Sequence, residues 1–430
     1  MRIAIIGAGF SGMAAAWDFR RAGHEITIFE AADYVGGLAA GFQERNWDWS
    51  VEKFYHHWFA SDRHILGLIK ELGWEQKVLF PRPYTVMYYD GEFYPFDSIP
   101  KMALFPGLGW GLNKVRFGLV GLYLRLTNNW KPLEKVTVDA WMRKWAGEKV
   151  YKLMWEPLVM GKFGENYYKK VNMAWMWARL KARTTRLGTF EGGFQNFANM
   201  FALRLQEMGV EIRLRTGVTR IETVAGAGGV SVVGPAGPES FDRVLVTLSP
   251  EAMSRLVPSL PENYLRGLRE LKSMGAVVMV LALKRQLSEQ GYYWYNLPKS
   301  AGYPFLALVE HTNYVGAEHF GGDHIVYLGD YLEPDHEYFR MTQEQLLERF
   351  IPALKKFNPK FDRDWIKNTW VFRTAYAQPV PLVGHSKNIP EIKTPVEGIY
   401  FASMSQVYPW DRGTNFAVEI GRKAARLMME

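Results

Sequence analysis

The feature that most constrains this chain is a glycine-rich turn close to its start. Residues 2–6 (Arg-Ile-Ala-Ile-Ile) are apolar after the arginine, as a buried parallel strand would be. Gly7-Ala8-Gly9-Phe10-Ser11-Gly12 follows, and the alanine-rich stretch 11–22 predicts a helix that ends at Gly23. Residues 25–30 (Glu-Ile-Thr-Ile-Phe-Glu) predict a second strand. The chain therefore opens with a strand–turn–helix–strand unit of the Rossmann type.

Each glycine of this turn has a separate role in such a unit. Gly7 allows the tight turn, Gly9 lets the backbone approach a pyrophosphate, and Gly12 lets the helix pack closely on the strand. The first N–H groups of the helix then face the phosphates. Glu30 ends the second strand, where an acid binds the ribose of the adenosine. The residues that we expect to bind the dinucleotide here are Gly7, Gly9, Phe10, Ser11, Gly12 and Glu30.

A second glycine pair follows the acid, in Tyr34-Val35-Gly36-Gly37-Leu38. With these residues the chain resembles the superfamily of flavin-containing amine oxidases, protoporphyrinogen oxidases and phytoene desaturases. Members of that group place a glycine pair close to the flavin phosphates and the ribityl chain. The resemblance implies FAD as the cofactor and adds Gly36, Gly37 and Leu38 to the binding residues. Many members have an arginine where this chain has Leu38, which removes one phosphate contact.

The resemblance continues along the whole chain. Glu191-Gly192-Gly193-Phe194 looks like the glycine pair that precedes a helix in the family. Residues 209–212, 217–221 and 242–247 look like the segments that follow it, and residues 398–402 like the last strand. The resemblance implies that Val218 gives backbone contacts to the adenine. It also implies that the last helix lies beneath the flavin pyrophosphate.

The chain departs from the family directly after that last strand. The family usually has Gly-Asp or Gly-Glu there, whereas this chain has Ser403 and Met404, and a carboxylate comes only at Asp411. We interpret the polar run before the last helix as a remodelled cofactor floor, in which Arg412 can pair with a phosphate. The alternative is ordinary N-capping of the last helix by Thr414. The residues expected in the floor are Ser403, Met404, Arg412, Gly413, Thr414 and Asn415.

Two histidines, His56 and His57, follow the glycine pair. His57-Trp58-Phe59 is similar to the His-x-Phe stretch that UDP-galactopyranose mutases, which share the flavin fold, place near the isoalloxazine ring. A neutral histidine there can tune flavin N5 or relay a proton, so His57 is the candidate catalytic residue. A histidine with a purely structural role is the alternative. Aromatic residues 292–295 and polar residues 310–313 are candidates for a pocket wall over the flavin.

The pattern predicts an α/β protein with a Rossmann-type FAD-binding domain and an α+β substrate domain, the latter a mixed sheet with a helical subdomain. We assign residues 1–85, 188–272 and 395–430 to the discontinuous FAD domain, and residues 86–187 and 273–394 to the substrate domain. Helices are expected at 62–72, over most of 101–186, and at 194–208, 342–357 and 415–429. Strands are expected at 84–96, as a hairpin through Asp90-Gly91, and at 210–214, 242–247, 276–284, 305–311, 324–331 and 399–402; residues 226–237 are expected to be a turn-rich hairpin.

Charge is distributed unevenly. The net charge is +8, but residues 101–190 hold 17 Lys/Arg against 5 Asp/Glu, together with seven of the 16 tryptophans. Basic and aromatic side chains together indicate an anionic small-molecule substrate or peripheral contact with a membrane surface, and a solvated basic face is the alternative. The sequence shows no nucleic-acid module, no metal-spaced ligand cluster and no second dinucleotide motif. It holds no cysteine and no apolar run of transmembrane length, which fits a cytoplasmic protein with non-covalent FAD.

These observations together predict an FAD-dependent oxidoreductase of the amine oxidase type. We expect it to transfer a hydride from a C–H or C–N bond of its substrate to flavin N5, with the protein supplying position and electrostatics. Two alternatives stay open at the level of sequence. One is a non-redox flavoenzyme that resembles UDP-galactopyranose mutase and acts on a nucleotide sugar. The other is a flavin-binding membrane or carrier protein without turnover.

Overall fold

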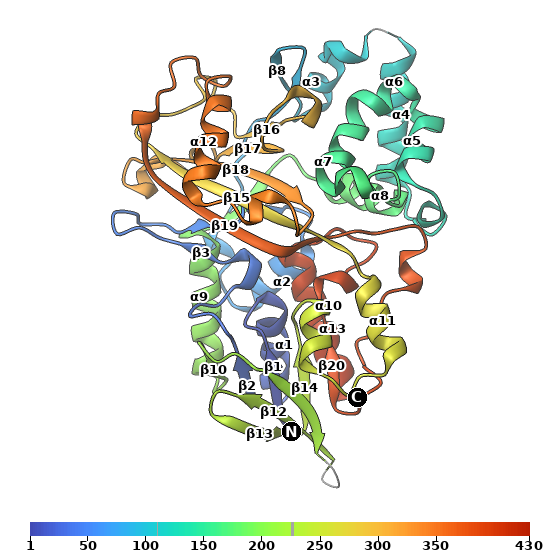
Figure 1. The fold of residues 1–430 in the computed structure, drawn as a ribbon, viewed down its shortest axis with the longest axis vertical. Helices are drawn as coiled ribbons and strands as arrows, with labels where there is room; N and C mark the ends of the chain where they lie inside the picture. Colours follow the sequence, from blue (N-terminus) through green and yellow to red (C-terminus); the bar gives the residue numbers. More distant parts are fainter. Residues whose placement is uncertain (110, 225–227) are drawn as a thin grey trace.

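The computed structural model describes residues 1–109, 111–224 and 228–430. Its lower half in Figure 1 is built on a five-stranded sheet whose strands are all parallel, in the order β10-β2-β1-β14-β20. The strands are β1 (Arg2–Ile6), β2 (Glu25–Phe29), β10 (Glu211–Arg213), β14 (Arg243–Val246) and β20 (Ile399–Phe401). Trp110 and the first part of the predicted hairpin at 226–237 lie outside the described residues.

Both faces of this parallel sheet are covered, which explains why its strands are apolar throughout. Ile3 and Ile5 of β1 belong to a core shared with three helices, whereas Ala4 and Ile6 belong to the core on the opposite face. The helices are α1 (Phe10–Arg21), α9 (Gly193–Glu207) and α13 (Thr414–Met429). The opposite face carries the antiparallel strands β11 (Arg220–Val224), β12 (Gly229–Gly234) and β13 (Gly237–Phe241), with α10 (Pro250–Leu256) and α11 (Glu262–Glu270).

The upper half contains a mixed seven-stranded sheet in the order β19-β15-β18-β17-β16-β7-β8. Alternate residues of β15 face two different cores: Val277, Met279 and Leu281 pack against α12 (Gln343–Leu354), and Val278 and Val280 face the other way. The strands are β7 (Thr85–Tyr89), β8 (Glu92–Pro95), β15 (Ser273–Leu283), β16 (Trp294–Asn296), β17 (Ala307–Glu310), β18 (His324–Leu332) and β19 (Ile366–Pro379).

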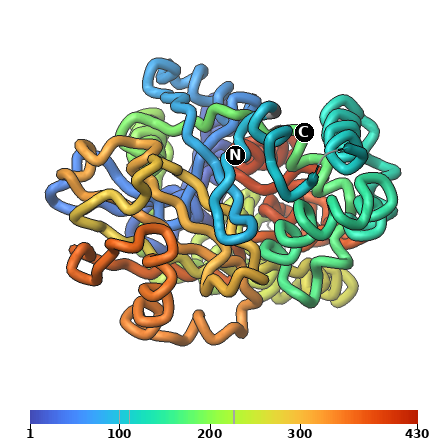
Figure 2. Tube along the Cα trace, turned by 90° about the horizontal axis from the view of Figure 1, so that it is seen from above, coloured from blue at the N-terminus to red at the C-terminus, as the bar shows by residue number. Residues whose placement is uncertain are grey.

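A helical segment between β8 and residue 182 forms its own core around Trp175 and Trp177. It comprises α3 (Ile99–Leu104), α4 (Leu112–Leu126), α5 (Val138–Ala146), α6 (Glu148–Val150), a π-helical stretch at Tyr151–Trp155, α7 (Glu156–Tyr167) and α8 (Met173–Ala182). Seen from above, this segment and the sheet strands of residues 273–379 lie on opposite sides of the molecule (Figure 2). In the part of the chain that the structure describes, no helix has both the length and the apolar character needed to cross a bilayer.

The predicted α/β fold with a Rossmann-type sheet is confirmed. The strands of the parallel sheet fall at 2–29, 211–246 and 399–401, and the mixed sheet takes residues 85–95 and 273–379. The sequence analysis missed β16, α10, α11 and β19. β19 is an edge strand whose residues are mostly half-buried on both faces, so it lacks the alternation that marks a strand with one buried face.

Small elements join the two halves. Strand β9 (Leu187–Phe190) pairs with both β5 (Trp58–Phe59) and β6 (Val78–Leu79), and α2 (Arg63–Glu71) packs on α13. The strand β5 places Trp58 against Thr414 in the first turn of α13, and His57 just before it packs on Trp294 of the mixed sheet. Residues that are distant in sequence meet there, and the candidate site lies in the same region.

Candidate active site

The two glycine segments of the sequence lie directly against each other. Gly36 donates its N–H to the carbonyl of Ala8 at 2.9 Å, and Gly9 and Gly36 form an isolated parallel bridge. A Cβ on Gly12 would lie 2.1 Å from the carbonyl oxygen of Gly7, so this position accepts only glycine. A Cβ on Gly9 would instead have only one described atom, the Cα of Gly37 at 3.9 Å, within 4 Å. Gly9 thus borders open space of the kind that a phosphate needs.

Glu30 connects these loops to the strand end. Its carboxylate accepts the backbone N–H of Ala8 at 2.8 Å and that of Ala32 at 2.9 Å. Thr216 donates its N–H to the carbonyl of Glu30, which places the segment leading to Val218 beside the same strand end. The predicted ribose acid and the predicted adenine contact therefore come from neighbouring loops at the carboxyl edge of the sheet, where open α/β sheets bind ligands.

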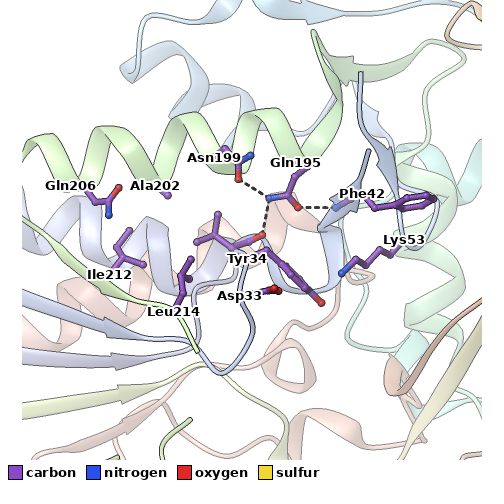
Figure 3. A pocket seen from close by; sticks show the side chains of 12 residues that line it. Asp33, Tyr34, Phe42, Lys53, Gln195, Asn199, Ala202, Gln206, Ile212 and Leu214 are labelled. Carbon is purple, nitrogen blue, oxygen red and sulfur yellow. Dashed lines mark hydrogen bonds between the residues drawn. The ribbon is translucent and has the colours of Figure 1, made fainter. Parts of the chain in front are cut away.

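Gln195 of α9 fixes the second glycine loop, and the sequence analysis did not identify it. Its amide oxygen accepts the N–H of Gly41 at 2.9 Å, and its amide nitrogen donates to the carbonyl of Val35 at 3.1 Å. Figure 3 shows this side chain pointing from the helix toward the loop, at the edge of a groove of about 560 Å³ that Tyr34 and Lys53 also line. The ammonium of Lys53 lies 3.4 Å from the centre of the Tyr34 ring. Gln195 therefore positions Gly36 and Gly37 without belonging to either motif.

The start of α1 offers an unsatisfied polar group. The hydroxyl oxygen of Ser11 is buried and has no hydrogen-bond partner among the described residues. Phe10 beside it is buried and stacks on Phe197 at 5.3 Å, which fixes the first turn. The first N–H groups of a helix have no partner within it. An FAD pyrophosphate would satisfy both the hydroxyl and these N–H groups, so the residues present fit this cofactor.

The segment after the last strand forms a closed turn. Ser403 caps the short helix at Met404–Gln406: its hydroxyl accepts the N–H of Ser405, and its own N–H donates to the Gln406 side chain. Tyr376 of β19 lies against both serines, with its hydroxyl 2.7 Å from the Ser405 oxygen. The Ser403 side chain is thus already hydrogen-bonded within the protein, and the contact of this turn with the cofactor stays a prediction.

The first turn of α13 is held by residues of two other elements. Trp58 donates its indole N–H to the hydroxyl of Thr414 at 2.8 Å, and the amide oxygen of Asn415 accepts the N–H groups of His64 and Ile65. The alternative of N-capping by Thr414 is wrong, because the N-cap is Gly413 and no side chain caps this helix. Both side chains serve neighbouring elements, which leaves the first backbone N–H groups of α13 for a ligand.

Arg412 lies against the mixed sheet. Its guanidinium hydrogen-bonds the hydroxyl of Tyr331 in β18 and lies 5.2 Å from the centre of that ring, while its Nε has no partner among the described residues. The sequence had suggested a phosphate partner for Arg412. The side chain therefore lies against β18 of the mixed sheet, and its contact with a phosphate stays a prediction.

Asp411 is the centre of a buried charged cluster that the sequence analysis did not predict. Its carboxylate pairs with Arg179 of α8 at 3.1 Å and accepts the indole N–H of Trp175 and the amide of Gln378, both at 3.2 Å. Burial opposes ionisation of Asp411, but nearby Lys162, Arg179 and Arg412 outweigh it and lower its pKa. The carboxylate therefore stays charged, and it joins α8, β19 and the start of α13.

Lys162 of α7 completes this cluster, and it is buried. Its ammonium donates to Gln378 at 2.8 Å and lies 4.6 Å from the centre of the Tyr331 ring. Burial, followed by the charge of Arg179, lowers its pKa well below the ordinary lysine value. The one signal in the sequence is a lysine within the otherwise apolar run Leu158–Phe163. The cluster holds three basic side chains against one carboxylate.

His57 lies in an aromatic environment beside this cluster. Its ring packs edge-on against Phe59 and Trp294, with centroid distances of 5.3 and 6.2 Å, and its buried Nδ1 has no partner among the described residues. Burial, followed by the charge of Arg183, lowers the pKa of His57 to about 3, so the ring is neutral near pH 7. His56 differs, because its Nδ1 donates to the carbonyl of Phe54 at 2.6 Å.

The candidate pocket wall divides into two kinds of residue. Trp294 faces the site, since it packs edge-on against both His57 and Tyr55. Tyr55 itself rests on Gly329 of β18, where any Cβ would lie 2.7 Å from its ring. Glu310 has a structural role instead: it is fully buried and accepts the N–H groups of Leu287 and Ser288. Sequence reasoning grouped these residues by composition and could not separate the two roles.

Glu52 is a further buried acid near the glycine loops that the sequence analysis missed. Its carboxylate accepts the N–H of Phe194 at the start of α9 at 3.0 Å, and its carbonyl accepts the hydroxyl of Tyr327. Burial raises the pKa of Glu52 to about 7. The residue thus satisfies a helix N-terminus and titrates near neutral pH.

Comparisons with known proteins agree with this geometry. The family model described as flavin containing amine oxidoreductase matches residues 10–429. The chain is 22% identical to a probable zeta-carotene desaturase from Synechococcus elongatus, over all of this chain and 99% of the relative. It shares its fold with a putative protoporphyrinogen oxidase from an Exiguobacterium species (TM-score 0.78, 19% identity, 100% of this chain and 98% of the other). The same holds for cyclohexylamine oxidase from Brevibacterium oxydans (TM-score 0.70, 17% identity, 99% and 98%).

Proposed function

The chain belongs to the flavin-containing amine oxidoreductases and is an FAD-dependent oxidoreductase, and we propose that it desaturates a substrate that is not a cationic amine: one carbon gives up a hydride, and the adjacent carbon releases a proton to solvent. FAD supplies the hydride acceptor, its N5 atom, when it is bound. The observation that carries the proposal is the charged cluster around Asp411. A relative that the chain matches over its whole length is named a probable zeta-carotene desaturase, and this supports the same choice because a carotene is an uncharged hydrocarbon.

The charge of the cluster argues against an amine substrate. Arg179 and Arg412 face a single carboxylate, Asp411, and Lys162 lies beside them. This net positive charge lies next to the first turn of α13, and the resemblance to the family implies that the flavin binds there. A protonated amine that approached this region would meet like charge at low dielectric, which disfavours the ammonium. An uncharged hydrocarbon substrate does not meet this repulsion.

The walls of the region fit a substrate with apolar surface. Tyr55 and Trp294 pack edge-on at 4.9 Å, and the neutral ring of His57 packs against the same Trp294. Aromatic rings of this kind exclude water and position an unsaturated chain by stacking. Because His57 is uncharged near pH 7, it can hold a proton at one ring nitrogen and accept a hydrogen bond at the other.

The test is anaerobic reduction of the purified holoenzyme by a panel of substrates, followed by the loss of oxidised-flavin absorbance. The panel contains a polyene hydrocarbon in detergent, a diamine and a UDP-sugar. We expect the polyene to bleach the flavin and the diamine not to do so. Faster bleaching by the diamine would overturn the proposal. The mutase alternative would be favoured if only the dithionite-reduced protein, and not the oxidised protein, converted the UDP-sugar without net consumption of electrons.

A matched pair of variants tests the role of charge. Arg412→Gln removes one cation of the cluster while it keeps a hydrogen-bond donor for Tyr331, and Arg266→Gln removes an exposed cation on α11. We expect Arg412→Gln to increase the rate of reduction by amines relative to wild type, and Arg266→Gln to leave it unchanged. Equal rates in all three proteins would show that the cluster does not select the substrate.

A further inference from the structure

Helix α4 presents an apolar stripe to the solvent. Leu112, Val115, Leu119, Leu122 and Leu126 recur at intervals of three and four residues, and their side chains are 54–69% exposed. We call these five residues the leucine stripe. The spacing places them on one face of the helix, over a length of about 21 Å at 1.5 Å per residue.

The stripe is not needed for packing, because the opposite face of α4 makes the contacts with the protein. Val120 and Leu124 are buried in the core of the helical segment, and Phe117 stacks on Trp155 at 5.5 Å. α4 packs on α5 and α8 through this inner face. A contiguous exposed row of large apolar side chains on a well-packed helix indicates an interaction surface.

The sequence stretch that carries the stripe holds charge of one sign. From residue 98 to residue 133 the sequence has no Asp or Glu, and it has the basic residues Lys101, Lys114, Arg116, Arg125 and Lys131. Most acids of the rest of the segment are occupied elsewhere. Glu134 binds Ser386, and Asp139, Glu148 and Glu156 all bind Arg143. The basic residues of this stretch, which include Arg116 and Arg125 of α4 itself, are therefore complementary to an anionic partner.

An aromatic row borders the stripe. Tyr123, one turn from Leu119, stacks on Trp141 at 6.0 Å, and Trp141 lies against Trp145 at 6.2 Å. Tyr123 and Trp145 are about half exposed, and Lys144 lies over the Trp145 ring. Tyrosine and tryptophan with flanking basic residues are the side chains that proteins place at the level of lipid headgroups.

We propose that the leucine stripe docks this protein on an anionic lipid bilayer, with α4 lying in the plane of the interface. At 15 residues α4 is too short to span a bilayer, but an interfacial helix needs only one apolar face and basic flanks. A second copy of the chain is a poorer occupant. It would bring the basic flanks of both copies together without an acid of residues 98–133 to pair with them. The inference is independent of the proposed reaction.

The test is vesicle flotation of the FAD-loaded protein with phosphatidylcholine vesicles, with and without phosphatidylglycerol, at low and high salt. Leu119→Ser/Leu122→Ser removes the middle of the stripe. Leu203→Ser is the control, since Leu203 is equally exposed (57%) on α9 of the nucleotide-binding domain. Arg116→Gln, with Arg266→Gln as its control, tests charge. All variants change exposed residues, and flavin absorbance and circular dichroism verify that each is folded.

We expect wild-type protein to float with the phosphatidylglycerol vesicles and to be released by salt. The double leucine variant should bind about tenfold or more weakly, and Arg116→Gln about fivefold more weakly, with both controls unchanged. Absence of binding at low salt, or equal binding by the double variant and Leu203→Ser, would overturn the proposal. So would a wild-type dimer in light scattering that the double variant converts to a monomer, because the stripe would then be a subunit interface.

Discussion

Trp58 donates its indole N–H to the hydroxyl of Thr414, and this bond attaches the histidine-bearing segment to the first turn of the last helix. Trp58 is fully buried, and His57 precedes it directly. In the family's arrangement the start of the last helix lies beneath the flavin. The bond therefore holds the candidate catalytic histidine near the first turn of α13, although the two bonded residues are more than 350 positions apart in sequence.

The first prediction concerns this bond. Thr414→Val removes the acceptor and leaves the buried indole N–H of Trp58 unsatisfied, which costs on the order of 1–3 kcal/mol of unfolding free energy. We expect weaker FAD affinity as well, because the start of α13 loses its support. Denaturant unfolding with and without FAD measures both effects. Thr223→Val is the control, since Thr223 is exposed on β11, among the antiparallel strands that cover the opposite face of the parallel sheet. If both variants lost the same unfolding free energy and the same FAD affinity, the Trp58–Thr414 bond would not support the start of α13.

The second prediction separates two glycines of the first motif. Gly12→Ala places a Cβ 2.1 Å from the Gly7 carbonyl oxygen, so the protein should fold poorly even without cofactor. Gly9→Ala meets only the Cα of Gly37, at 3.9 Å, among the described atoms, and its φ of −74° is ordinary. The apoprotein should therefore keep its stability.

Gly9→Ala should instead affect FAD binding. Gly9→Ala should raise the FAD dissociation constant by about tenfold or more, equivalent to ~1.4 kcal/mol, because the methyl group enters the space that the pyrophosphate needs. Titration of the apoprotein with FAD measures it, with Gly67→Ala as the matched control on α2. If FAD binds Gly9→Ala as tightly as it binds wild type, the cofactor does not lie on this turn.

The third prediction tests His57 as a residue of the chemistry. His57→Phe keeps an aromatic ring between Phe59 and Trp294 but removes both nitrogens. We expect FAD affinity to change little and flavin reduction by substrate to slow by about 10- to 100-fold, as for loss of a neutral hydrogen-bonding group that is aimed at the reacting atoms. Stopped-flow reduction measures it, with the exposed His64→Phe as control. A variant that reduces at the wild-type rate would assign His57 a packing role.

The sequence predicted the parts of the site that a single local motif encodes. The glycines of both loops, Glu30 and the strand that precedes them follow from one supersecondary unit, in which each residue type has a physical reason. The structure adds that these loops touch through Gly9 and Gly36, a contact between residues that the sequence had already marked.

The parts that the sequence missed are contacts between distant elements. Lys162, Gln378 and Asp411 come from a helix, an edge strand and a loop, and only the packing of the three brings them within hydrogen-bonding distance. Gln195 looks like any polar residue of an amphipathic helix until its loop partners are known. Thr414 shows the same limit, because its position suggested a cap and its partner is Trp58.

The fourth prediction concerns the charged cluster. Asp411→Asn leaves Arg179 and its basic neighbours without a counter-charge in a buried position, at a cost of about 3–5 kcal/mol in unfolding free energy. The control Glu165→Gln changes an exposed acid on α7 and should cost nothing measurable. Arg179→Met/Asp411→Asn should recover part of the loss. A double variant less stable than Asp411→Asn would show that Arg179 does not act through Asp411.

The last prediction uses the titration of Glu52. Burial raises the pKa of Glu52 from 4.5 to about 7 in the folded protein. Between these pH values the folded protein holds a proton that the unfolded chain has released, so unfolding free energy falls as the pH rises. The stability linked to protonated Glu52 is fully present below pH ~4.5 and is lost as the pH rises through ~7.

Glu52→Gln removes this titration but keeps an oxygen that can accept the N–H of Phe194. We expect the variant to lose less stability than wild type between pH 5 and 8, by on the order of 2–3 kcal/mol, and the exposed Glu165→Gln to follow wild type. Denaturant unfolding across this pH range measures the difference. Asp330 and Glu310, whose pKa values burial also raises to about 7, remain in the variant, so its pH dependence should be reduced and not abolished. Parallel curves for wild type and Glu52→Gln would mean that Glu52 is ionised throughout, held by the helix start that it caps.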